Sequence, residues 1–152
     1  MSVEFYSKVL PDEGTYCVAV LPAGEGQRMR HIFVDSIDEL VDRVEERKHD
    51  SHVFIGMANF DGHSRKNAKS LKSFFVDLDV GDTKEFSSQE EAVNALGKFI
   101  QSQQLPPPVV VDSGNGIHAY WMLDTAVPVE EWKLYADKFK QLCIDNGLQI
   151  DP

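Results

Sequence analysis

The sequence Phe74-Phe75-Val76-Asp77-Leu78-Asp79-Val80 lies at the middle of the chain and gives its strongest β-strand signal. Because successive side chains of a strand point to opposite faces, every second residue from Phe74 onward belongs to one wholly apolar face. The other face carries Phe75 and then the two carboxylates of Asp77 and Asp79. We expect the apolar face to pack against helices and the acidic face to remain open.

A second stretch, residues 117–123, alternates in the same way. Ile117 and every second residue after it are apolar, whereas His118 points to the opposite face. If helices cover only one side of the sheet, Asp77, Asp79 and His118 gather on the other side. The sequence thus predicts a cluster of two carboxylates and one imidazole on an open sheet.

The remaining periodicity predicts an α+β fold, with an antiparallel sheet and helices on one of its faces. The six expected strands cover residues 16–21, 30–34, 52–60, 73–80, 109–111 and 117–123. Capping boxes at Ser36 with Glu39 and at Ser88 with Glu91 predict the starts of two helices. A third amphipathic helix is expected over residues 129–146.

Size and charge limit the function. The chain has 152 residues, which suits one domain, and a net charge of −10. A protein that coats duplex DNA is usually basic because it neutralises phosphates. Any nucleic acid would therefore be held by a local basic patch, by bound metal or by residues outside this chain.

The sequence also indicates a compartment. Cys17 and Cys143 lie far apart and form no CxxC pair, which fits a reducing cytoplasm. We find neither a signal peptide nor an apolar run of about 20 residues. We therefore expect a cytoplasmic protein without a membrane span.

The acidic pair needs a compensating interaction. Two residues of strand separate Asp77 from Asp79 by roughly 6–7 Å. Their repulsion costs roughly 2–3 kcal/mol at an effective dielectric constant near 20. Protonation of one carboxylate or a divalent cation between them commonly relieves such a pair, and carboxylate oxygens suit Mg²⁺ or Mn²⁺. The simpler interpretation is a solvated aspartate at a strand end, because DxD alone is a weak signal.

The stretch Ser113-Gly114-Asn115-Gly116-Ile117-His118 connects two expected strands. Glycines let a turn tighten and let backbone N–H groups approach an anion. Ser113 and His118 can both donate to a phosphate oxygen. A Gly-rich hairpin with a surface histidine explains the same residues if this motif is taken alone.

Together the motifs resemble the archaeo-eukaryotic primase superfamily, in particular the primase-polymerases of phages and plasmids. In that family a hydrophobic strand ends in DxD or DxE, an SxH-type motif follows, and a third acidic residue comes after a helix. Asp77 with Asp79, Ser113 to His118, and Asp151 in Leu148-Gln149-Ile150-Asp151 match these motifs in order. The resemblance covers about residues 50 to 152.

The resemblance implies a nucleotidyltransferase that extends a primer on single-stranded DNA from NTPs or dNTPs. In-line attack of a 3′-hydroxyl on the α-phosphate would be assisted by two Mg²⁺ or Mn²⁺ ions. The residues implied are Asp77, Asp79 and Asp151 as metal ligands, His118, Ser113, Gly114 and Gly116 at the triphosphate, and Lys84 and Arg65 as further phosphate contacts. The three aspartates and His118 would be the catalytic residues.

The family fold places this chemistry on an RRM-like sheet beside a smaller N-terminal α/β unit. Residues 1–152 would form one catalytic module. Family members usually continue past the third acidic residue into a basic, Arg-containing stretch, so we expect the module to be incomplete at its C-terminus and weakly active or inactive. A helicase domain can follow in the longer natural chain, whose role would be phage or plasmid replication.

Two other functions fit the same residues. A metal-dependent nuclease or phosphodiesterase could use the same aspartates and histidine, but it would shorten nucleic acid rather than extend it. A non-catalytic RRM-like binding module would be expected to show exposed aromatics on a basic sheet face. Here that face carries Asp77 and Asp79.

Overall fold

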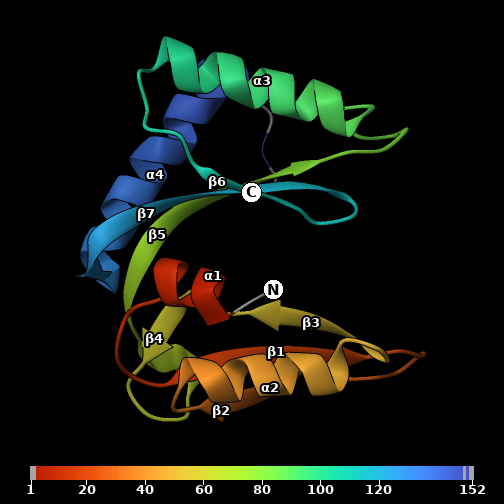
Figure 1. Ribbon diagram of the computed structural model, residues 1–152, viewed down its shortest axis with the longest axis vertical. Helices are drawn as coiled ribbons and strands as arrows, with labels where there is room; N and C mark the ends of the chain where they lie inside the picture. The colour runs from red at the N-terminus through yellow and green to blue at the C-terminus, as the bar shows by residue number, and fades with distance from the viewer. Residues whose placement is uncertain (1–2, 149, 151–152) are drawn as a thin grey trace. The chain divides into compact units, whose positions relative to one another are not determined.

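The computed structural model describes residues 3–148 and residue 150, without the side chain of Arg65 (Figure 1). The described residues form seven β-strands, four α-helices and one 3-10 helix. The chain divides into two compact units. The first unit is Met1–Lys72 with Leu123–Trp132, and the second is Ser73–Met122 with Lys133–Pro152. The predicted α+β class with antiparallel sheets is confirmed.

The first unit contains a three-stranded antiparallel sheet in the order β2-β1-β3. Strand β1 (Tyr16–Pro22) pairs on one side with β2 (Arg30–Val34) and on the other with β3 (Ser51–Ile55). Helix α2 (Ile37–Arg47) lies along this sheet, and α1 (Val3–Val9) contacts α2 (Figure 1). Helix α1 was not predicted, because seven residues are too few to show a clear helical period.

The single strand predicted over residues 52–60 is wrong. The structure divides it into β3, which ends at Ile55, and β4 (Ala58–Phe60), which belongs to a different sheet. Asn59 fixes β4 in place: its side-chain amide donates to the Glu13 carbonyl at 2.6 Å, and its Oδ1 accepts from the Ser70 backbone at 2.9 Å. These bonds depend on residues distant in sequence, so the local apolar pattern could not predict them.

The second sheet has the order β4-β5-β7-β6. Strands β5 (Ala68–Asp79) and β7 (Gly116–Pro128) are both longer than predicted, and β6 (Val109–Asp112) pairs antiparallel with β7. Helix α3 (Gln89–Ser102) joins β5 to β6, and α4 (Val129–Asp145) follows β7. The sequence strand-helix-strand-strand-helix matches the first five elements of a ferredoxin-like, β-α-β-β-α-β arrangement.

The core of the second unit lies between its helices and one face of β5 and β7. It is formed by Val76, Leu78, Phe86, Ala92, Leu96, Phe99, Ile117, Ala119, Trp121, Cys143 and Leu148. The predicted alternation is confirmed where the core residues of β5 and β7 occupy the face assigned to the helices. Two residues of the opposite face, Ser73 and Tyr120, are buried as well. Phe139 of α4 packs against this core, and its ring lies 5.1 Å from Trp121, 6.2 Å from Phe74 and 6.3 Å from Phe99.

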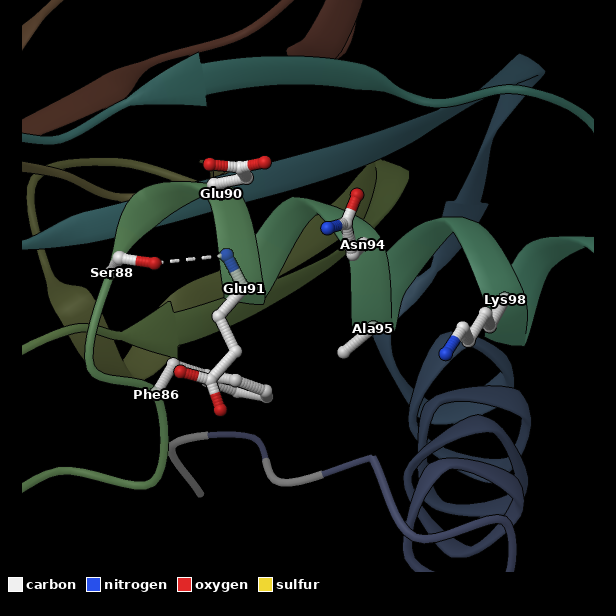
Figure 2. Close-up of a pocket in the computed structure, with 7 residues that line it drawn as sticks. All are labelled: Phe86, Ser88, Glu90, Glu91, Asn94, Ala95 and Lys98. Carbon is white, nitrogen blue, oxygen red and sulfur yellow. Dashed lines mark hydrogen bonds between the residues drawn. The ribbon is translucent and has the colours of Figure 1, made fainter.

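Both predicted helix starts are present. At the start of α3, the bond that the glutamate makes differs from that of a capping box. Figure 2 shows the side-chain oxygen of Ser88 accepting from the Glu91 backbone N–H, at 3.1 Å. In a capping box the glutamate bonds the N-cap residue itself. Here Glu91 instead accepts from the backbone N–H and the hydroxyl of Ser87, at 2.9 and 2.6 Å. These bonds favour the ionised form and lower the pKa of the Glu91 carboxyl.

We predict that Phe139→Ala destabilises the protein by about 2–4 kcal/mol, because it removes a partly buried ring from three aromatic contacts. The matched control is Tyr135→Ala, one turn earlier on α4, where the side chain is 52% exposed. Its effect should stay within about 0.5 kcal/mol. Urea unfolding measures both, and equal losses in the two variants would contradict the packing described.

Candidate functional site

The open face of the second unit carries the two predicted carboxylates. Asp77 and Asp79 alternate along β5 with the buried Val76 and Leu78, and their side chains are 36% and 34% exposed. Helices α3 and α4 contribute to the core on the opposite face. The structure therefore brings both aspartates to a partly solvated surface, as the alternation predicted.

His118 lies beside Asp77. Its Nε2 is 3.3 Å from Asp77 Oδ1, and its Nδ1 is 3.2 Å from the Tyr120 hydroxyl. The backbone N–H of Val80 donates to the Asn115 carbonyl at 2.8 Å, so the end of β5 runs next to the start of β7. This antiparallel approach brings together two residues 41 positions apart in the sequence.

Lys84 lies beside Asp79. The chain turns after β5, with the Lys84 N–H donating to the Gly81 carbonyl at 3.2 Å, and Lys84 Nζ comes to 3.7 Å from Asp79 Oδ2. Each carboxylate thus has a basic neighbour, which is a third way to relieve the repulsion besides protonation or a bound cation. Because Lys84 is 53% exposed, solvent screens its pair with Asp79 and the pair adds little to stability.

The Gly-rich stretch forms a tight hairpin turn between β6 and β7. The Ser113 N–H donates to the Gly116 carbonyl at 3.0 Å, which leaves Gly114 and Asn115 as the two turn residues. Gly114 has a φ of +87°, a conformation that other residues rarely adopt. A Cβ at Gly116 would collide with the Leu78 carbonyl oxygen of β5. Both glycines are therefore required by the backbone, whatever else the turn binds.

The carboxylate of Asp112 already occupies the hydrogen-bond donors of this turn. The Gly114 N–H donates to Asp112 Oδ1 at 2.8 Å, and the Gln89 side-chain amide donates to the same oxygen at 3.2 Å. Gln89 also donates to the Gly116 carbonyl at 3.0 Å. The turn can therefore accommodate a negatively charged oxygen, and a phosphate that used the Gly114 N–H would have to displace the Asp112 carboxylate.

The donor atoms suit a hard divalent cation only in part. Among the residues that the structure describes, no three His, Cys, Asp or Glu side chains gather in a way that could hold a metal ion. Asp151, the predicted third ligand, lies outside the described residues. Mg²⁺ is commonly bound by one or two carboxylates together with water and substrate phosphates. Asp77 and Asp79 fit that mode.

The two other predicted phosphate contacts are Arg65 and Ser113. Arg65 begins the 3-10 helix η1 (Arg65–Asn67) in the first unit, and its side chain lies outside the described residues. Ser113 is exposed at the start of the turn. Sequence reasoning gave no role to Asp112 or Gln89, and only the three-dimensional turn reveals them. The strand alternation does predict that Tyr120 shares the face of His118, because it lies two residues further along the strand.

Neither cysteine is placed for thiol chemistry. Both cysteines are buried, and burial raises the pKa of the Cys143 thiol to about 11, so it stays protonated and unreactive near neutral pH. The groove at the start of α3 is lined by Phe86, Ser88, Glu90, Glu91, Asn94, Ala95 and Lys98 (Figure 2), and it contains none of the predicted site residues. No helix within the described part of the chain is long and apolar enough to cross a membrane.

Comparison of the chain with protein-family models, with curated proteins and with solved structures gives no match.

Proposed function

We propose that this chain is the catalytic module of a metal-dependent primase-polymerase, which transfers nucleotides from NTPs or dNTPs to a primer on single-stranded DNA. The observation that supports it best is the pairing on the open face of the second unit. Asp77 lies beside His118, and Asp79 lies beside Lys84. The order and context of the sequence motifs agree with this proposal.

The two aspartates would hold the cation. Their side chains are about one-third exposed, so water and substrate oxygens can complete the coordination of Mg²⁺ or Mn²⁺. A cation bound there would lower the pKa of the attacking 3′-hydroxyl and offset the charge that develops on the leaving pyrophosphate. Asp151 would add a third carboxylate, as the resemblance implies.

The basic partners would bind the phosphates. His118 and Lys84 each face a carboxylate in the structure. When the carboxylates bind a cation, their interaction with these side chains weakens, and the N–H groups of His118 and Lys84 can donate to phosphate oxygens instead. The Gly114 N–H would join them after a phosphate oxygen displaces Asp112. Charge-assisted bonds of this kind are about twice as strong as neutral ones.

A nuclease would use the same aspartates and histidine, so product length separates the two functions. We predict that the protein lengthens a labelled primer on single-stranded DNA slowly, as expected of a weakly active module, and only when a nucleoside triphosphate and Mn²⁺ or Mg²⁺ are both present. Asp77→Asn/Asp79→Asn should lower this rate by at least about 100-fold, because a bound cation contributes several kcal/mol to such a reaction.

The matched control for this assay is Asp124→Asn, which removes an exposed carboxylate from β7 outside the candidate site. It should keep the wild-type rate. Shortening of the primer without added nucleotide would favour the nuclease, and equal extension by the double variant would show that the acidic pair is not catalytic.

We predict that His118→Ala weakens nucleoside triphosphate binding by about 10- to 150-fold, the equivalent of one lost charged hydrogen bond of roughly 1.5–3 kcal/mol. Its affinity for Mn²⁺ alone should change much less. His52→Ala, an exposed histidine of β3, is the control. Calorimetry with each ligand gives both affinities, and unchanged triphosphate binding by His118→Ala would exclude this role.

A further inference from the structure

On the open face of the second unit, the charged side chains give way to apolar ones two residues before Asp77. Phe75 lies there on β5 and is 38% exposed, and Met122 on β7 is 40% exposed. Tyr120 lies two residues before Met122 on β7, and its ring centroid is 6.3 Å from that of Phe75. We refer to these three residues, Phe75, Tyr120 and Met122, as the apolar end of the open face.

Tyr120 is the buried residue of the apolar end, and its hydroxyl lies beside His118. Tyr120 is only 9% exposed, and its hydroxyl lies 3.2 Å from His118 Nδ1. The Phe75 and Tyr120 rings are tilted by 43° to one another, so they do not stack face to face. Phe75 therefore offers part of its own ring to solvent beside a buried aromatic that is tied to the candidate site.

Along the open face, charged and apolar groups follow one another in the same order as the phosphates and the base of a nucleotide. The charged end of this face carries the Asp79–Lys84 pair next to the Gly-rich turn, and its centre carries the Asp77–His118 pair. Its other end is the apolar end. Two residues of strand correspond to roughly 6.8 Å, which is comparable to the sugar that separates a phosphate from its base. Bases stack on aromatic side chains with little dependence on sequence.

We propose that the apolar end is the nucleoside subsite of the incoming nucleotide, with its base or sugar against Phe75 and Met122. The triphosphate then points from Asp77 toward Lys84 and the turn at Gly114. This inference rests on the proposed function, and it fixes the direction in which the substrate lies along β5. It also separates binding of the phosphates from binding of the base.

The test compares adenosine triphosphate with inorganic tripolyphosphate, which has the phosphates but no nucleoside. Affinities are measured by calorimetry with Mn²⁺ present for the wild type, Phe75→Ala and Phe54→Ala. Phe54 lies on β3 of the first unit and is 52% exposed, so its variant controls for the loss of an exposed phenylalanine. Phe75→Ala should bind adenosine triphosphate about 10- to 100-fold more weakly and tripolyphosphate equally well. Phe54→Ala should bind both ligands as the wild type does.

A second variant, Phe75→Trp, keeps an aromatic ring and reports directly on stacking. It should retain nucleotide affinity, and adenosine triphosphate should quench its added fluorescence, measured as the difference from the parent protein with Trp121 and Trp132. Tripolyphosphate should not quench it.

The outcomes are distinct. Unchanged adenosine triphosphate affinity in Phe75→Ala, without quenching in Phe75→Trp, would overturn the nucleoside subsite and leave the proposed function standing. Equal loss of both ligands in Phe75→Ala would make Phe75 a structural residue and would also overturn the inference. Failure of the wild type to bind either ligand would contradict the proposed function and the subsite together.

Discussion

Two like charges on one face of β5 are the constraint around which the second unit is built. Leu78 between them points into the core and is fully buried. Because side chains alternate along a strand, both carboxylates point to the open face and need their charge partners there. The chain supplies His118 from β7 and Lys84 from the turn after β5. This arrangement places a basic side chain beside each carboxylate, and both aspartate side chains stay about one-third exposed.

The position of His118 depends in turn on how closely β7 approaches β5. Gly116 permits that approach because any larger residue would meet the Leu78 carbonyl. Gln89 at the start of α3 then ties the turn to the helix through Asp112 and the Gly116 carbonyl. Hydrogen bonds thus join the helix start to the turn, and Gly116 lies directly against the backbone of the acidic strand.

The sequence predicts the parts of the site that follow from strand period alone. Asp77 and Asp79 are two residues apart on one strand, so their side chains point to the same face. On the other strand His118 points away from the apolar face, so it joins the aspartates when helices cover the apolar faces of both strands. The sequence could not predict the pairing of Lys84 with Asp79, which depends on the turn geometry after β5. It also could not divide residues 52–60 correctly, because Asn59 is held by Glu13 and Ser70 from other segments. Local patterns predict faces, whereas contacts between distant segments decide register and partners.

Binding of Mn²⁺ to the acidic pair tests the central claim most directly. Electron paramagnetic resonance of Mn²⁺ titrated into the protein measures the free ion, and the wild type can be compared with Asp77→Asn/Asp79→Asn and with the Asp124→Asn control. We expect the double variant to bind Mn²⁺ at least about tenfold more weakly, because affinity for hard cations follows the number of charged oxygen ligands. Superimposable titrations of the wild type and the double variant would contradict a metal-dependent function for this face.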